Sequence, residues 1–126
     1  MISVDLPWPP SVNHYYRATV RNGRPCQIKT DPARSYRDQV WVACIMAGVN
    51  GRRLSGRLAV ELKLCPPTRR SFDIDNRCKG VLDGLTYAKV WLDDAQVDQL
   101  TVTRGDKVPG GLAEVCIMEL AESQTG

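Results

Sequence analysis

Apolar and polar residues alternate in several short segments of the chain, which is the pattern of strands with one buried face. A separate signal, Asn22-Gly23 between two short alternating runs, predicts an exposed hairpin over about residues 18–29. We expect the last two long strands to pair as a hairpin, because Pro109-Gly110-Gly111 lies between them. The alternation predicts long strands at residues 2–6, 58–65, 97–108 and 112–120.

Helical spacing of apolar residues is present in two further segments. The first helix, over residues 31–47, opens on a cap residue followed by proline and ends at Gly48. The second is capped by Asp73 or Asp75 and reaches about Ala88. Two helices and four long strands in mixed order predict an α/β or α+β fold, with a mixed, mainly antiparallel four-stranded sheet packed against both helices.

Length and composition fit one domain over residues 1–126. No segment reaches the roughly 20 apolar residues that span a membrane, and the start lacks the charged region of a signal peptide, so we expect a cytoplasmic protein without membrane contact. Five scattered cysteines without Cys-x-x-Cys spacing favour reduced thiols over disulfides or a zinc site. The single histidine, His14, cannot form a histidine-rich metal site and is expected to be a loop residue.

The net charge of +3 conceals an uneven distribution of charged residues. Residues 1–72 hold twelve Lys and Arg against four Asp and Glu, whereas residues 73–126 hold five against ten. Such a division suits a metal-dependent enzyme that acts on nucleic acid, because cations bind phosphates while carboxylates bind the metal. Basic residues that only solvate loops and helix faces would give the same totals.

Four aspartates near the second helix carry the candidate chemistry: Asp73, Asp75, Asp93 and Asp94. Residues i and i+2 of a strand share a face, so Asp73 and Asp75 can reach one cation from a strand end. Mg²⁺ takes oxygen ligands, and clustered carboxylates without a cation would repel one another. We therefore expect the later aspartates to return beside the first pair around a metal ion. As a bare pattern, Asp-x-Asp is also typical of a helix cap or a turn.

Lys79 lies four residues after Asp75, one turn along the same helix face. Beside a metal it would neutralise a phosphate oxygen or the charge that develops on the leaving group. Otherwise it would form an ordinary i, i+4 ion pair. The basic dipeptide Arg69-Arg70, just upstream, suits contact with a polyanion backbone.

The segments LPWPPSVNHYYR, DIDNRCKGVLDGL and VWLDDAQV together resemble the RusA family of Holliday junction resolvases, small phage and prophage-associated endodeoxyribonucleases. The likeness covers nearly the whole chain. It implies a homodimer that binds four-way junction DNA and resolves it by paired symmetric nicks, in DNA recombination and repair. It also implies Mg²⁺ or Mn²⁺ as cofactor. Two sites related by a two-fold axis suit a nearly two-fold junction.

By motif position, the resemblance assigns catalysis and metal binding to Asp73, Asp75 and Asp94, with Asp93 as a neighbour of less defined role. Lys79 matches the family's essential lysine. Phe72 either stacks on bases near the crossover or completes the core at a strand end. The candidate DNA-binding residues are Arg69, Arg70, Asn13, Tyr16, Arg17, Arg21, Arg24 and Phe72.

Two other classes of protein stay open. A catalytically inactive protein that binds junctions or other DNA would show salt-sensitive binding and no cleavage with any divalent ion. The intact set of carboxylates argues against it. A hydrolase of small phosphate compounds would need a closed pocket, and the basic surplus of the N-terminal half is excessive for such a substrate.

Overall fold

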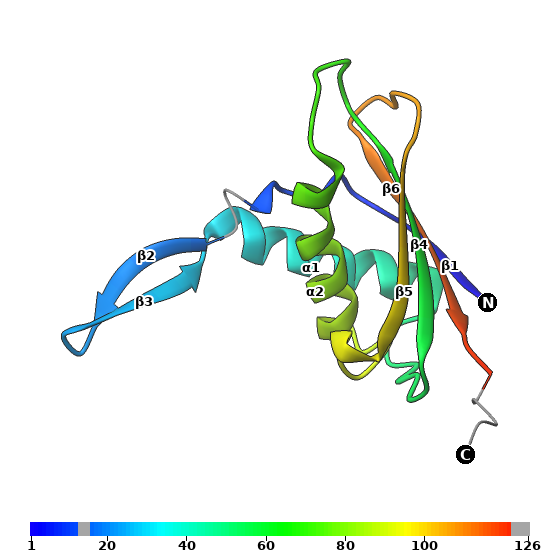
Figure 1. The fold of residues 1–126 in the computed structure, drawn as a ribbon, viewed down its shortest axis with the longest axis horizontal. Helices are drawn as coiled ribbons and strands as arrows, with labels where there is room; N and C mark the ends of the chain where they lie inside the picture. Colours follow the sequence, from blue (N-terminus) through cyan, green and yellow to red (C-terminus); the bar gives the residue numbers. More distant parts are fainter. Residues whose placement is uncertain (13–15, 122–126) are drawn as a thin grey trace.

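The structure, a computed structural model, describes residues 1–12 and 16–121. Two helices lie against one face of a four-stranded sheet, and a two-stranded ribbon extends away from this body (Figure 1). The elements are β1 (Ile2–Leu6), β2 (Tyr16–Arg21), β3 (Arg24–Lys29), α1 (Asp31–Ala47), β4 (Leu58–Cys65), the 3₁₀ turn η2 (Ile74–Arg77), α2 (Cys78–Tyr87), the 3₁₀ turn η3 (Asp94–Gln96), β5 (Val97–Arg104) and β6 (Leu112–Glu119).

The main sheet has the order β1-β6-β4-β5, with β4 and β5 parallel and the other two pairs antiparallel. The predicted α+β fold with a mixed, mainly antiparallel sheet is confirmed. The predicted hairpin between the last two strands is wrong, because β6 lies between β1 and β4 rather than beside β5. The reason is burial: β6 places Val115 and Ile117 in the core, whereas β5 is a largely exposed edge strand. Strand β5 also ends at Arg104 instead of residue 108.

Helix α1 spans the predicted residues, but its cap differs from the prediction by one position. Thr30 is the N-cap, and its hydroxyl accepts a hydrogen bond from the N–H of Ala33 at 3.4 Å. Asp31 lies in the first turn and forms an ion pair with Arg34. Gly48 ends the helix with φ of 72°, a left-handed conformation that glycine adopts without strain.

The second helical segment begins as the turn η2 and continues as α2. Asp73 occupies the N-cap position of η2 but makes no capping hydrogen bond with its side chain. Helix α2 crosses α1 closely at Gly84, where an added Cβ would lie 2.8 Å from Cγ2 of Val40. Val81 and Leu85 of α2 are fully buried in the core between the helices and the sheet.

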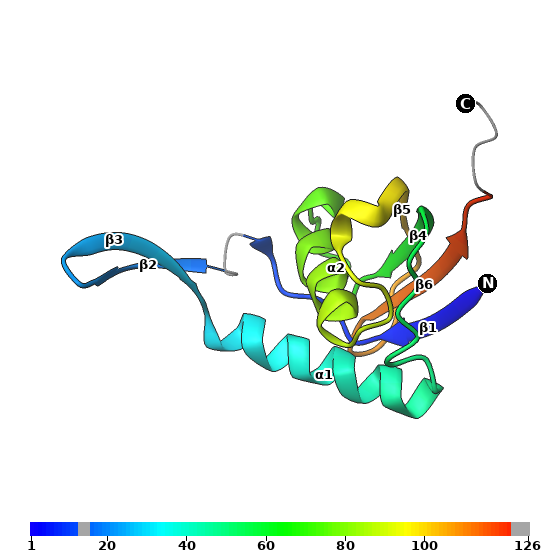
Figure 2. The same cartoon turned by 90° about the horizontal axis from the view of Figure 1, so that it is seen from below.

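The predicted exposed hairpin is confirmed as the pair β2–β3, which forms a separate two-stranded sheet and projects beyond α1 (Figure 2). Asn22 and Gly23 take positive φ values of 53° and 74°, as a tight two-residue turn requires.

All five cysteines are free. Among the residues that the structure describes, no helix has the length and apolar character needed to cross a membrane.

Candidate active site and nucleic-acid interface

The proline-rich segment, residues 7–11, packs against the start of the acidic motif. Arg77 donates from Nη1 to the carbonyl of Pro9 at 2.8 Å, and its guanidinium lies 5.4 Å from the ring centre of Trp8. Trp8 in turn meets Phe72 edge-on, with ring centres 5.1 Å apart. These contacts fix the backbone on both sides of Asp73. Arg77 and Trp8 were not among the predicted site residues, although Arg77 lies inside the motif itself.

The first carboxylate pair lies at the N-terminal end of α2, with Asp73 and Asp75 both exposed to solvent. Asn76 donates from Nδ2 to Oδ2 of Asp73 at 3.4 Å, which orients that carboxylate. Burial, and then the negative charge of Asp75, raise the pKa of the Cys78 thiol. Two open carboxylates separated by one residue suit an oxygen-liganded cation that also binds phosphate and water.

Lys79 projects from the first turn of α2 and pairs with Asp83 rather than with a residue of the metal motif. Its Nζ lies 3.3 Å from Oδ1 of Asp83, whose other oxygen lies 3.9 Å from Nζ of Lys29. Asp83 is only 14% exposed, while the two lysine side chains are 43% and 34% exposed. A mostly buried carboxylate thus holds two ammonium groups at the edge of the site.

The later aspartates lie at the other end of α2. Oδ1 of Asp94 accepts hydrogen bonds from the hydroxyl of Thr86 and, at 3.2 Å, from Nε1 of Trp91. Asp93 caps η3 by accepting from the N–H of Ala95 at 2.8 Å. The carboxylate of Asp93 therefore has a structural role in the turn, while Asp94 is fixed against the helix.

Helix α2 keeps the two groups of aspartates apart within one chain. Thr86, the partner of Asp94, lies eight residues after the start of α2, about 12 Å along the helix axis. Asp73 and Asp75 precede that start, so they lie at the opposite end (Figure 1, where the segment after α2 is yellow). Within residues 1–12 and 16–121 no three His, Cys, Asp or Glu side chains are placed to hold one metal ion. The expected meeting of all these carboxylates in a single chain is therefore not found.

A basic cleft of about 650 Å³ opens beside Phe72, outside the carboxyl ends of the parallel strands β4 and β5. Arg69 and Arg70 enter it from the segment after β4, and Arg104 and Lys107 enter it from the end of β5. Sequence reasoning identified the first two cations but missed the others, because their convergence depends on the parallel pairing of β4 with β5. The cleft offers four cations to a polyanion, against one carboxylate from Asp106.

Arg104 also supports the acidic motif directly. Its Nη2 donates to the carbonyl of Phe72 at 2.8 Å, and its guanidinium stacks 4.2 Å from the centre of the Phe72 ring. Phe72 is half-buried and packs against the core, so the structure favours a place for it at the edge of the core. Of the other candidates, Asn13 and His14 lie outside the described residues, Tyr16 begins β2, and Arg17, Arg21 and Arg24 lie exposed on the ribbon.

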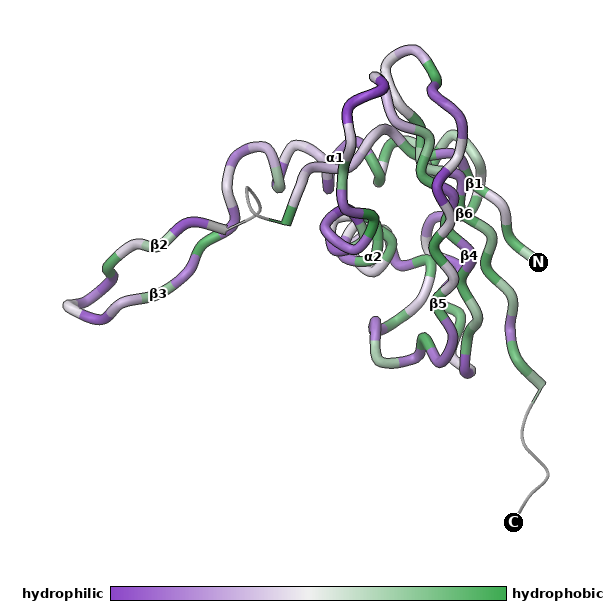
Figure 3. The backbone as a smooth tube through the Cα atoms, turned by 45° about the horizontal axis from the view of Figure 1, so that its top comes forward, coloured by the Kyte–Doolittle hydropathy of each residue, from purple (hydrophilic) through white to green (hydrophobic). Residues whose placement is uncertain are grey.

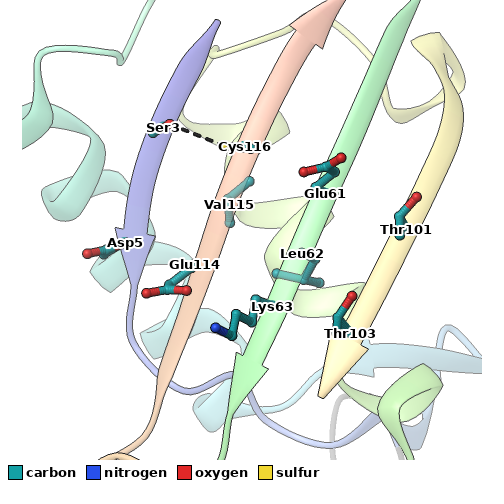
Figure 4. Close-up of a pocket in the computed structure, with 10 residues that line it drawn as sticks. All are labelled: Ser3, Asp5, Glu61, Leu62, Lys63, Thr101, Thr103, Glu114, Val115 and Cys116. Atoms are coloured by element: carbon teal, nitrogen blue, oxygen red, sulfur yellow. Dashed lines mark hydrogen bonds between the residues drawn. The ribbon is translucent and has the colours of Figure 1, made fainter. Parts of the chain in front are cut away.

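The open face of the sheet has the opposite electrostatic character. A groove of about 570 Å³ crosses this face, on the side away from the helices (Figure 4). Three carboxylates, from Asp5, Glu61 and Glu114, line it with the single cation of Lys63. An anionic backbone is therefore repelled from this face and attracted to the cleft at the strand ends.

The family and the relatives named below carry the same description. The family described as "Endodeoxyribonuclease RusA" matches residues 7–118. Proteins called "Crossover junction endodeoxyribonuclease RusA" from Shigella sonnei and Escherichia coli are 36% identical to the chain, over 94% of either sequence. A protein of the same name from Enterobacteria phage HK97 is 38% identical over 91% of this chain and 92% of its own.

Proposed function

Because this chain belongs to the RusA family of endodeoxyribonucleases, we propose that it acts on four-way junctions and resolves them by paired symmetric nicks. The relatives named as crossover junction nucleases, which align along almost the whole chain, carry this proposal. The setting would be DNA recombination and repair, in a phage or prophage context that the relative from phage HK97 supports.

A divalent cation, Mg²⁺ or Mn²⁺, fits the oxygen donors of this site. Asp73 and Asp75 would hold it, since both carboxylates are open to solvent and close in sequence. Such an ion, when bound, acidifies a water molecule and polarises the scissile phosphate. The protein supplies the rest: Arg69, Arg70 and the cleft cations bind the backbone beside the ion, and Lys79 neutralises charge on the phosphate oxygens.

Asp94 can join this site only from a second copy of the chain. A two-fold axis perpendicular to α2 would lay two copies of the helix antiparallel, so that the end bearing Asp94 meets the partner's end bearing Asp73 and Asp75. Tyr87 and Leu92, both nearly half exposed near Asp94, provide apolar surface for such pairing. The proposed homodimer therefore completes each carboxylate set across its interface, with one set for each nicked strand.

Mixing two inactive variants tests the function and the shared site together. Asp75→Asn and Asp94→Asn homodimers should bind a synthetic four-way junction but not nick it. In a mixed dimer, a shared site restores one intact set, so one strand should be nicked. If each site belonged to one chain, both sites of the mixed dimer would be defective and no nick would form.

A nicking assay of the unmutated protein tests the competing proposal, which is an inactive DNA-binding protein. Metal-dependent nicking of the junction, mapped on all four strands, excludes it; binding without cleavage under Mg²⁺ and Mn²⁺ would establish it. Nucleotide substrates in the same assay test for a hydrolase of small phosphate compounds.

A further inference from the structure

The ribbon β2–β3 presents all its arginines on one side. Residues directly opposite each other in an antiparallel pair point to the same face, and the face changes with each residue along a strand. The register Arg17↔Ile28, Thr19↔Cys26 and Arg21↔Arg24 therefore defines one face, and the other carries Ala18, Val20, Pro25 and Gln27. Figure 3 shows the hydrophilic and hydrophobic residues interspersed along both strands.

Repulsion between arginines on this face destabilises the ribbon in the free protein. Arg21 and Arg24 are exposed and directly opposite each other next to the turn, and like charges in this position destabilise a strand pair. An isolated two-stranded ribbon is already marginally stable in water. A polyanion laid across Arg21 and Arg24 would relieve their repulsion and stabilise the ribbon.

The base of the ribbon is fixed to the body beside the candidate active site. Lys29, the last residue of β3, faces Asp83 of α2, the same carboxylate that holds Lys79. Arg34 of α1 donates from Nη1 to the carbonyl of Lys29 at 2.6 Å. The orientation of the ribbon is thereby tied to the helix that carries Lys79.

We propose that the ribbon lies along one duplex arm of the DNA, with Arg17, Arg21 and Arg24 on its phosphates, away from the nicked bond. Six residues per strand give a length of about 20 Å, which equals about six base pairs of duplex. The contact is with the backbone and carries no sequence preference. The proposal rests on the proposed function only for the form of the DNA; the ribbon would bind linear duplex in the same way.

The test compares Arg21→Ala/Arg24→Ala with a charge-matched control, Arg52→Ala/Arg53→Asn. The control removes two exposed arginines beyond the opposite end of α1, and asparagine tolerates the positive φ of Arg53. Dissociation constants are measured against salt concentration, for a four-way junction and for a linear duplex of equal length. Hydroxyl-radical footprinting on the junction locates the protected phosphates.

The ribbon variant should bind both DNAs at least tenfold more weakly at moderate salt. Its slope of log K against log salt should fall by about 0.9 for each phosphate that the ribbon no longer neutralises. Protection should disappear over about six base pairs of an arm and persist at the crossover, while the control resembles the parent. Equal slopes and footprints for the ribbon variant and the parent would overturn the proposal. If the parent nicks no junction, the function fails separately, and the slopes on linear duplex still decide the role of the ribbon.

Discussion

Oδ1 of Asp83 lies 3.3 Å from the ammonium of Lys79, one turn earlier on α2. Asp83 therefore positions the lysine that we assign to the scissile phosphate. Because it also faces Lys29, it connects the candidate active site to the base of the ribbon. This connection is a consequence of helical spacing and of the path by which β3 enters α1.

Asp83→Asn should slow nicking at saturating DNA by about tenfold, or ~1.4 kcal/mol, since Lys79 would lose its fixed position. Affinity for the junction should stay equal or rise, because a negative charge is removed. Single-turnover rates and binding constants separate the two effects. Asp38→Asn, which alters an exposed carboxylate paired with Arg37, is the control and should change neither. A fall in affinity without a fall in rate would contradict the positioning role.

Gln96→Leu should lower the free energy of unfolding by about 2–4 kcal/mol. Its side chain is buried, accepts hydrogen bonds from two N–H groups in residues 92–93 at 2.8 Å, and donates to two carbonyls in residues 54–56 at 2.7 and 2.9 Å. Leucine would leave these four groups without their partner. Urea denaturation measures the change, with exposed Gln99→Leu expected to stay within about 0.5 kcal/mol of the parent. A neutral Gln96→Leu would show that the four bonds do not stabilise the turn.

Gly84→Ala should destabilise the protein by about 1–3 kcal/mol, because the new methyl group meets Val40 where the two helices cross. Gly56→Ala is the matched control, since a methyl group there meets nothing within 4 Å. A Val40→Ala background removes both γ-methyl groups but leaves its Cβ 2.9 Å from the added methyl, so Gly84→Ala should cost less there without becoming neutral. Thermal unfolding of the parent, Gly84→Ala, Val40→Ala and the double variant measures the coupling between the two positions; additive effects would refute the close contact.

Stability should fall as the pH rises from about 9 to about 11. Burial raises the pKa of the Cys44 thiol from its ordinary value of 9.0 to about 11. The folded protein therefore keeps a proton that the unfolded chain releases in this range, so the stabilisation is complete below pH 9 and is lost as pH rises through 11. The loss is up to about 3 kcal/mol. Urea midpoints across this range should decline less steeply for Cys44→Ala than for the parent; parallel curves would contradict the shift.

The elements of the fold could be predicted from the sequence because their signals are local. Asn22-Gly23 forms a tight turn and Gly48 ends α1, because these residues readily adopt positive φ without help from distant parts of the chain. The pairing of β6 is not local. The sequence of residues 112–120 does not indicate that this strand pairs with β1 and β4 instead of β5. That pairing depends on which strand buries more apolar surface.

The candidate site shows the same difference between local and non-local signals. Spacing predicted Asp73 and Asp75 as site residues, and in the structure both precede α2 and are open to solvent. Arg104 and Lys107 could not, because they reach the cleft only through the parallel strands β4 and β5. The position of Asp94 was beyond sequence reasoning as well: its hydrogen bond to Thr86 follows from the length of the helix and the turn after it.

The ten-residue length of α2 also has a consequence for control of the nuclease. Under the proposed shared site, a solitary subunit would have two incomplete ends and no cutting centre, so strand scission should decline with the square of protein concentration once subunits dissociate. Newly made or dilute subunits would then be harmless to the surrounding genome, and breakage would require two of them to assemble on the same branched substrate.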